Sequence, residues 1–347
     1  MLDAPQTPVA SSPASARATV AALIARARAA QAIADRWTQA QADEAAVAAG
    51  WAIVEPARNR ELAGLAVRDT GLGNVADKIA KNRRKTIGLL RDLQGARSVG
   101  VIAEDAERGL IEIARPVGVV AAITPSTNPA ATPANNIVNA LKGRNAIIVA
   151  PSPKGQSTLT RLLQFVHAEL ERIGAPRDLV LQLPSPVTRE QTFELMRQAD
   201  LVVATGSARN VRGAYESGTP AIGVGVGNVV VIVDETADPG DAAAKIARSK
   251  TFDNATSCSS ENSVIAVDAV APALLAALAR EGGVLLDAHE KAALENAMFA
   301  QGKLASDFVE RRRKRNHHIL LGEAMLRKLG VPGVMNVPQI TRGGLDG

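Results

Sequence analysis

The chain contains one cysteine, Cys258, among its 347 residues. This cysteine lies in the run Thr256-Ser-Cys-Ser-Ser260, where every neighbour is small and polar. A lone thiol is either a small buried hydrophobe or a nucleophile, and this polar neighbourhood favours the nucleophile. We therefore predict a nucleophilic cysteine. A single cysteine also forms no intramolecular disulfide, which is typical of a reducing cytoplasm.

Composition narrows the class of protein. Hydrophobic residues make up 46% of the chain and aromatic residues only 2%. This balance suits helices packed on sheets and argues against a nucleic-acid platform of stacked aromatics. No stretch approaches the apolar length that spans a bilayer. We expect neither a nucleic-acid partner nor a membrane partner.

The net charge of +5 arises wholly from residues 308–347, which hold eight basic and three acidic residues. The run Arg311–Arg315 in this segment favours a solvated helix face or a divergent tail over a nucleic-acid patch. The pair His317–His318 has no cysteine or carboxylate at ligand spacing, so we predict no metal site.

Helices and strands must position the cysteine. Residues 17–95 show helical spacing of apolar residues. The basic stretch 78–85 is interpreted as a solvated face, and the alternative is that it attracts an anionic substrate. Residues 98–104 and 110–114 predict two strands joined by a polar turn. Short Val/Ile-rich runs then alternate with helical patterns, which indicates a parallel sheet covered on both faces. The predicted strands are 117–124, 145–149, 179–183, 201–204, 229–233 and 263–267, and the predicted helices are 133–142, 157–173, 239–249 and 272–279.

Three loops follow or precede these strands, where open α/β sheets bind ligands. Asn128 lies in a prolyl loop and either presents a rigid amide donor or caps the next helix. Gly206-Ser207 lies between a strand and a helix, an arrangement that binds phosphate. The glycines of 223–228 precede a strand rather than a helix, so they form no dinucleotide fingerprint and instead allow close backbone approach.

Together these motifs resemble the CoA-acylating branch of the aldehyde dehydrogenase superfamily. The resemblance covers roughly residues 17–305. Residues 69–74 and 81–86 are most similar to members that act on sulfoacetaldehyde. The runs that carry the resemblance are Thr124-Pro-Ser-Thr-Asn-Pro129, Asn139–Ile148, Ala204-Thr-Gly-Ser207, Gly218–Asn228 and Lys250–Glu261.

The resemblance implies an α/β fold with a Rossmann-variant cofactor domain and a second α/β catalytic domain. It implies that Cys258 is the nucleophile and that Asn128, with the backbone N–H of Cys258, forms the oxyanion hole. The implied cofactor is NAD or NADP, with coenzyme A as co-substrate. The residues implied to bind the cofactor are Thr124, Pro125, Gly206, Ser207 and Gly225.

The resemblance also implies the reaction. Hydrolytic members place a glutamate at about Gly223, where it activates water, and this loop has no carboxylate. Without that base a thioester hydrolyses poorly, whereas a thiol such as coenzyme A needs less help. The implied reaction oxidises an aldehyde to an acyl-CoA, with sulfoacetaldehyde as the first candidate. Acetaldehyde, propionaldehyde and succinate semialdehyde are the alternatives. Ala150 stands where hydrolytic members have a lysine at the cofactor ribose.

The expected domains are a disordered tail (1–16), a cofactor-binding domain (17–252, with the hairpin 98–114) and a catalytic domain (253–347). We expect the catalytic domain to be incomplete and divergent after about residue 305, as in a truncated member. An alternative from another class is therefore a non-catalytic remnant that binds dinucleotide or pairs with another subunit. We expect a cytoplasmic protein, and a homo-oligomer if the fold is complete.

Overall fold

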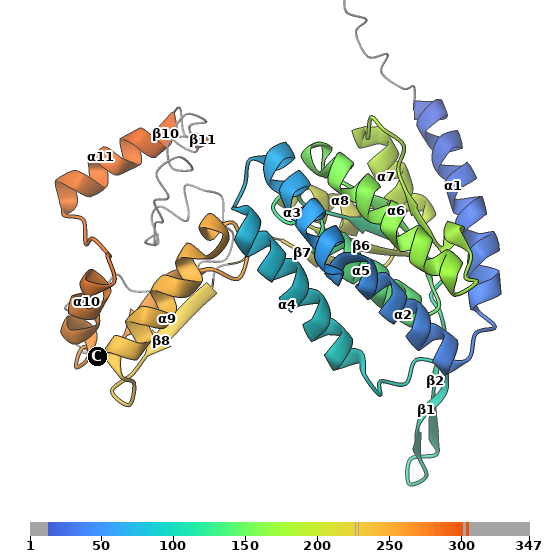
Figure 1. Ribbon diagram of the computed structural model, residues 1–347, viewed down its shortest axis with the longest axis horizontal. Helices are drawn as coiled ribbons and strands as arrows, with labels where there is room; N and C mark the ends of the chain where they lie inside the picture. Colours follow the sequence, from blue (N-terminus) through green and yellow to red (C-terminus); the bar gives the residue numbers. More distant parts are fainter. Residues whose placement is uncertain (1–12, 226, 228, 301–302, 305–347) are drawn as a thin grey trace, which may run out of the picture. The chain divides into compact units, whose positions relative to one another are not determined.

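The computed structural model describes residues 13–225, 227, 229–300 and 303–304 (Figure 1). Its contacts divide the chain into two compact units, each with its own apolar core. The first unit comprises the described residues up to Gly71 together with Lys78–Gly225. The second comprises Leu72–Asp77 and the described residues after Gly225. The second unit is therefore built from two separate stretches of the sequence.

The described residues before the first strand are mainly helical, as the sequence predicted for residues 17–95. Residues 13–16, which we assigned to a disordered tail, belong to the first helix, and Ala16 is fully buried. The prediction of a disordered tail is wrong for these residues, because the helix continues to Pro13 and buries Ala16. Residues 1–12 lie outside the described part. The helices are α1 (Pro13–Ala34), α2 (Gln39–Val54), α3 (Pro56–Thr70) and α4 (Val75–Leu93).

A parallel sheet forms the centre of the first unit, as predicted. Every residue of its two inner strands β3 and β4 is buried, which fits their continuous apolar sequences. The strand order is β5-β4-β3-β6-β7, and all neighbours are parallel. The strands are β3 (Val119–Ile123), β4 (Ala146–Ala150), β5 (Val180–Gln182), β6 (Leu201–Thr205) and β7 (Ala221–Val224).

The strand order reverses between β3 and β6. The chain moves outward from β3 through β4 to β5, and then returns to place β6 on the other side of β3. Right-handed crossovers put α5 and α6 on one face of the sheet and α7 and α8 on the other. Helix α2 packs against α5 and α6, and α1 packs against α7 (Figure 1). These helices are α5 (Ala131–Lys142), α6 (Gln156–Arg172), α7 (Arg189–Gln198) and α8 (Ala208–Glu216).

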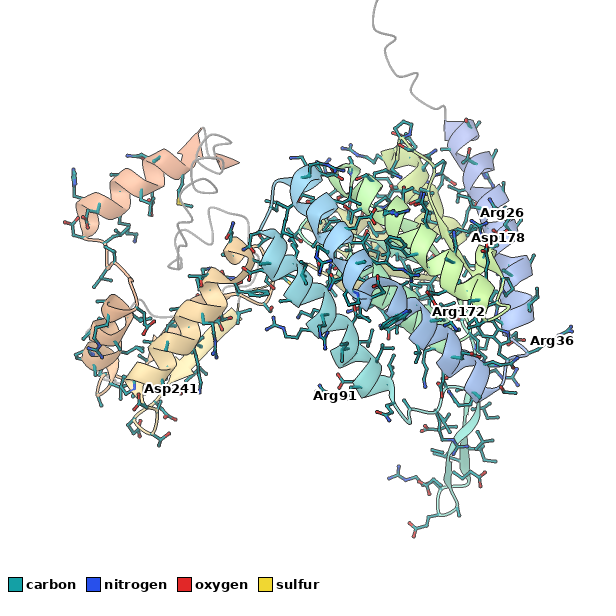
Figure 2. The ribbon with its side chains drawn as sticks, viewed as in Figure 1. Arg26, Arg36, Arg91, Arg172, Asp178 and Asp241 are labelled. Atoms are coloured by element: carbon teal, nitrogen blue, oxygen red, sulfur yellow. The ribbon has the colours of Figure 1, made fainter. Side chains whose placement is uncertain are left out.

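An ion pair fastens α1 to the turn before β5. The guanidinium of Arg26 donates to both carboxylate oxygens of Asp178, at 3.0 and 2.7 Å (Figure 2). The hydrogen bonds from Arg26 hold the pKa of Asp178 below its ordinary value. Both side chains are well exposed, so this pair stabilises the fold by less than about 1 kcal/mol.

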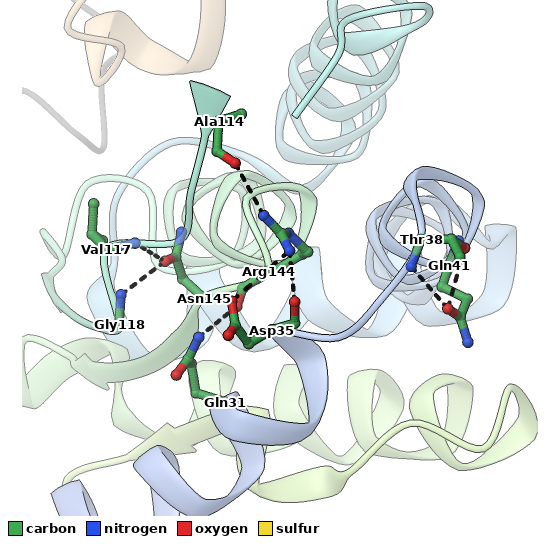
Figure 3. A network of polar contacts seen from close by, with 9 residues as sticks. All are labelled: Gln31, Asp35, Thr38, Gln41, Ala114, Val117, Gly118, Arg144 and Asn145. Carbon is green, nitrogen blue, oxygen red and sulfur yellow. Dashed lines mark hydrogen bonds and ion pairs between the residues drawn. The ribbon is translucent and has the colours of Figure 1, made fainter. Parts of the chain in front are cut away.

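A buried arginine joins the end of α1 to the start of the sheet. Arg144 has a left-handed backbone, and its guanidinium donates to the carbonyl oxygens of Asp35, at 2.6 Å, and Ala114, at 3.2 Å (Figure 3). The next residue, Asn145, accepts hydrogen bonds from the N–H groups of Val117 and Gly118, at 2.7 and 3.1 Å. These contacts satisfy backbone groups at the chain segment that leads into β3.

The predicted hairpin is present and antiparallel, with strands β1 (Gly100–Asp105) and β2 (Leu110–Ala114). It projects from the first unit (Figure 1). Its apolar side chains Leu110, Ile111 and Ile113 are exposed.

The second unit contains a parallel strand pair covered by helices. Strand β8 pairs with β9, and α9 packs against α10 around Val233, Ala243 and Leu274. We predicted the domain boundary after residue 252, whereas this pairing places the unit boundary after Gly225. The elements are β8 (Val229–Val233), α9 (Pro239–Thr251), the 3₁₀ turn η3 (Phe252–Ala255), β9 (Glu261–Ala266), α10 (Ala271–Arg280), α11 (Ala288–Met298), β10 (Phe299–Ala300) and β11 (Lys303–Leu304).

Some described helices and strands were not predicted: α7, α11, the edge strand β7 and the two-residue strands β10 and β11. Within the part of the chain that the structure describes, no helix combines the length and apolar character needed to cross a membrane.

Candidate functional site

The loop after β3 begins at the point where the strand order reverses, which is where doubly wound sheets bind ligands. Thr124 is buried, and its N–H donates to the carbonyl oxygen of Ala150 at 3.0 Å. The carbonyl oxygen of Thr124 accepts a hydrogen bond from the N–H of Ser152 at 3.2 Å. The loops after the neighbouring strands β3 and β4 are thus joined by backbone hydrogen bonds.

The turn after β6 meets this first loop. Gly206 has φ +138°, a conformation that residues with a side chain rarely adopt, and an ideal Cβ there would lie 3.5 Å from Cβ of Pro125. The N–H of Gly206 donates to the carbonyl oxygen of Val224 at 3.0 Å. The structure therefore brings together Pro125 and Gly206, two residues that the resemblance assigned to cofactor binding. Because Gly206 has no side chain, a ligand can approach its backbone closely.

Ser207 is the N-cap of α8. Its hydroxyl accepts a hydrogen bond from the N–H of Asn210 at 3.2 Å. The first N–H groups of a helix carry partial positive charge, so this turn suits an anionic group. The strand, glycine turn and helix predicted from the sequence are present in that order.

Asn128 does not cap the next helix. Helix α5 begins after Ala130, and no side chain caps it. The Oδ1 atom of Asn128 is buried and accepts no hydrogen bond from any described residue. Of the two alternatives that the sequence left open, the helix cap is therefore excluded, and the side-chain amide is not engaged at the helix start.

A buried lysine holds the backbone next to Asn128. Lys78 is 1% exposed, and its Nζ donates to the carbonyl oxygen of Thr127 at 2.9 Å. Lys81, one helical turn further on, is 2% exposed. We interpreted residues 78–85 as a solvated face, and this interpretation is wrong for these two lysines. The spacing of three residues places them on one helix face, and that face is turned inward.

Gly223 lies in strand β7, not in a loop. Its N–H donates to the hydroxyl of Tyr215 at 3.1 Å, and an ideal Cβ would lie 2.7 Å from Cγ1 of Val211. We expected hydrolytic relatives to have a glutamate at about this position. Here Val211 and Tyr215 lie so close to Gly223 that any side chain at 223 would require local movement. Gly225 follows β7, and a Cβ there would meet no atom within 4 Å.

Cys258 lies in the second unit, in the turn between η3 and β9, and its side chain is exposed. The turn is closed by a hydrogen bond of 3.1 Å from the N–H of Ser260 to the carbonyl oxygen of Ser257. The hydroxyls of Ser257 and Ser259 lie 2.9 Å apart. The backbone of Gly227 is close, since an ideal Cβ there would lie 3.8 Å from the carbonyl oxygen of Cys258.

Three residues with left-handed backbones precede this turn. Asp253, Asn254 and Ala255 have φ values of 52°, 52° and 54°. Such a conformation costs on the order of 1–2 kcal/mol for a residue with a side chain, and less for Asp and Asn. Asp253 is fully buried, and its N–H donates to Oδ2 of Asp77 at 2.7 Å. No sequence motif in this segment indicates three left-handed residues.

Glu261 begins β9, three residues after Cys258. The structure buries its Oε2, which accepts no hydrogen bond from a described residue. The hydroxyl of the preceding Ser260 is likewise buried without a described partner. Among the described residues no cluster of His, Cys, Asp and Glu could hold a metal, and His317–His318 lie outside them.

The comparisons with known proteins agree with the predicted resemblance. The sequence matches the aldehyde dehydrogenase family over residues 3–332, so the match continues past residue 305, where we expected it to fade. The acylating sulfoacetaldehyde dehydrogenase of Cupriavidus necator is 67% identical over 289 residues, which cover 83% of this chain and 59% of that protein. The chain thus spans about three fifths of the length of this curated relative.

Solved structures share the fold. An acetylating aldehyde dehydrogenase from Geobacillus thermoglucosidasius is 34% identical with a TM-score of 0.78, over 87% of this chain and 68% of that one. A propionaldehyde dehydrogenase from Rhodopseudomonas palustris, solved with bound CoA and an acylated cysteine, is 27% identical with a TM-score of 0.72, over 82% and 65%. The predicted resemblance to acylating members is confirmed, and the chain belongs to the aldehyde dehydrogenase family.

Proposed function

We propose that this chain oxidises an aldehyde to an acyl-CoA through a thioester on Cys258, with NAD or NADP as the oxidant. The observation that carries the proposal is the exposed, single cysteine just after a strained left-handed segment, in a chain that is 67% identical to an acylating sulfoacetaldehyde dehydrogenase. Sulfoacetaldehyde is accordingly the proposed substrate, and sulfoacetyl-CoA the product.

The first step is addition of the Cys258 thiolate to the aldehyde carbonyl, which forms a carbon–sulfur bond and an oxyanion. The proposed donors to this oxyanion are the Asn128 amide and the backbone N–H of Cys258. The unpaired, buried Oδ1 of Asn128 supports the proposal, because no described hydrogen bond commits this amide elsewhere. The contact between Lys78 and the Thr127 carbonyl would keep the loop in place during the reaction.

The cofactor site proposed for the first unit comprises Thr124, Pro125, Gly206, Ser207 and Gly225. The residues present suit a dinucleotide, because Gly206 lacks a Cβ beside Pro125 and Ser207 starts a helix at the reversal of strand order. When bound, the oxidised dinucleotide supplies the hydride acceptor that converts the adduct on Cys258 to a thioester.

The last step transfers the acyl group to coenzyme A. The thiol of coenzyme A loses its proton to solvent and attacks the thioester carbonyl as the thiolate, and Sγ of Cys258 leaves as the thiolate that began the cycle. Strand β7 supports transfer to a thiol rather than to water, because Gly223 is packed against Val211 and Tyr215 and offers no base. We expect ping-pong kinetics from the covalent intermediate.

The test is the intact mass of the full chain after incubation with sulfoacetaldehyde and each oxidised dinucleotide, without coenzyme A. We expect one added acyl group, which coenzyme A then removes. Cys258→Ala, the matched control, should gain no mass, and because the chain has one cysteine the site needs no further assignment. A folded, unmodified wild type would contradict the proposal, and dinucleotide binding without turnover would support the non-catalytic alternative.

The same intact-mass assay, repeated with other aldehydes, identifies the preferred substrate. Acetaldehyde, propionaldehyde and succinate semialdehyde are the competing substrates, and faster acylation by any of them would replace sulfoacetaldehyde in the proposal. We further propose a homo-oligomer, which mass photometry of the full chain would test.

A further inference from the structure

The proposed mechanism leaves one buried acid near the nucleophile without a role. Asp253 is fully buried, five positions before Cys258, and begins the left-handed turn. Its backbone N–H donates to Oδ2 of Asp77 at 2.7 Å, and its own Oδ1 accepts from the N–H of Asn74 at 3.2 Å. Two residues from a distant part of the sequence thus hold both the backbone and the side chain of Asp253.

The stretch that supplies these partners is itself ordered by Asp77. The side chain of Asn74 donates to Oδ2 of Asp77 at 2.6 Å, and the N–H of Asp77 donates to Oδ1 of Asn74 at 2.9 Å. The amide of Asn254 adds a long contact of 3.4 Å to the carbonyl oxygen of Gly73. One oxygen of Asp77 therefore accepts from both Asn74 and the left-handed turn.

Hydrogen bonds carry this order toward the cysteine. The N–H of Thr256 donates to the carbonyl oxygen of Asp253 at 3.0 Å, and the next turn is closed between Ser260 and Ser257. Cys258 lies inside this second turn. Its exposed side chain does not by itself fix the direction of the sulfur, so the backbone before it must do so.

We propose that Asp77 is a positioning residue for the nucleophile: its carboxylate oxygen holds the left-handed turn at Asp253 and so orients Cys258 for attack. This inference rests on the proposed thioester mechanism. Asp77 acts through the backbone of Asp253 and touches neither substrate nor cofactor in this role.

The test compares three variants of the full chain. Asp77→Ala removes the acceptor, whereas Asp77→Asn keeps an uncharged oxygen that can accept the same hydrogen bonds. Asp241→Ala is the matched control, because Asp241 is also a first-turn carboxylate and lies on α9 of the same unit (Figure 2). Its carboxylate forms an ion pair with the exposed Lys245 at 2.6 Å and is itself exposed. The first readout is the rate at which aldehyde and oxidised dinucleotide acylate Cys258.

We expect Asp77→Ala to slow acylation about tenfold to a hundredfold, since small misplacement of a reacting group has effects of this size. Dinucleotide affinity should not change. Alkylation of Cys258 by iodoacetamide should change less than about twofold, because this exposed sulfur needs no orientation for that reagent. Asp77→Asn and Asp241→Ala should acylate at the wild-type rate.

Hydrogen–deuterium exchange of residues 252–258 is the second readout, and it does not depend on activity. Exchange should be faster than wild type in Asp77→Ala alone. Equal acylation by wild type and Asp77→Ala would overturn the inference, as would an equal loss in Asp77→Asn and Asp77→Ala. If the wild type itself is never acylated, the proposed function fails, and unchanged exchange in Asp77→Ala would separately show that Asp77 does not hold the turn.

Discussion

The backbone N–H of Asp253 donates to the carboxylate of Asp77 at 2.7 Å, although 176 positions of sequence separate the two residues. Local signals cannot encode such a contact. It stabilises three successive residues with left-handed backbones, none of which is glycine, the residue that adopts this conformation most readily. The conformation of the chain just before Cys258 therefore depends on a distant segment as well as on the motif that contains the cysteine.

Asn128→Ala should lower kcat about 10²–10³-fold and leave the KM for dinucleotide nearly unchanged. The side chain is proposed to stabilise an oxyanion that exists only after attack, so its loss affects the reaction rather than ground-state binding. Steady-state kinetics measure both constants. Thr127→Ala is the neighbouring control, because the hydrogen bond from Lys78 to residue 127 is accepted by its backbone carbonyl, which alanine keeps. A fall in kcat of less than about tenfold for Asn128→Ala would contradict the assignment.

Gly206→Ala should weaken dinucleotide binding and destabilise the fold. At φ +138° an alanine is strained, and its Cβ would lie 3.5 Å from Cβ of Pro125, in the space that a close ligand would use. The dissociation constant from titration calorimetry and Tm are the measurements. Gly64→Ala is the control, since Gly64 lies within α3 with open space around a Cβ and should gain up to about 1 kcal/mol. Unaltered affinity in Gly206→Ala would exclude the turn from the cofactor site.

Gly223→Glu should not convert the chain to a hydrolase. A Cβ at 223 would lie 2.7 Å from Cγ1 of Val211 and 2.8 Å from the hydroxyl of Tyr215, so the substitution overpacks the edge of the sheet. We expect a loss of about 1–3 kcal/mol in the free energy of unfolding. Tm and the release of free acid without coenzyme A are measured together. Efficient hydrolysis by a variant as stable as wild type would show that the strand accommodates a catalytic base.

Glu169 should make stability depend on pH. Burial opposes its charge, but the hydrogen bonds from Arg58, at 2.7 Å, and Arg172, at 3.0 Å, outweigh burial and hold the pKa of Glu169 below its ordinary 4.5. Because the folded-state pKa is the lower one, the stabilisation is complete above pH 4.5 and is lost as the pH falls through the folded-state pKa.

Glu169→Gln should therefore lower the free energy of unfolding by about 1–3 kcal/mol at pH 7 and flatten its fall in acid. Urea titrations between pH 3 and about pH 7 measure this difference. The nearby Glu171→Gln is the comparison, because Glu171 is exposed and its contact with Arg177 is a surface pair. Parallel pH profiles for wild type and Glu169→Gln would refute the role of this carboxylate.

The strands of the central sheet could be predicted because burial on both faces demands continuous apolar runs, as in 119–123 and 146–150. Strand β7 was missed because Gly223 interrupts its short apolar run. Helix α7 has only ten residues, but the pair Thr188 and Gln191 forms a capping box that could have revealed its start.

The candidate site was predictable to the extent that it consists of local turns. The loop at 124–129 and the turn at Gly206 were located from strand ends, and their meeting followed only from the strand order. The burial of Lys78 and Lys81 could not be predicted, because lysine side chains are usually exposed to solvent. Which carbonyl a buried ammonium meets is decided by tertiary packing.

The assignment of Leu72–Asp77 to the second unit has a practical consequence for anyone who dissects this chain. A fragment that starts at residue 226 would contain the cysteine but lack both Asn74 and Asp77, so the N–H of Asp253 would lose the carboxylate that accepts its hydrogen bond. Limited proteolysis after Gly225 should, in contrast, yield two fragments that still co-elute. The N-terminal fragment retains Leu72–Asp77, whose hydrogen bonds to Asp253 hold the C-terminal fragment.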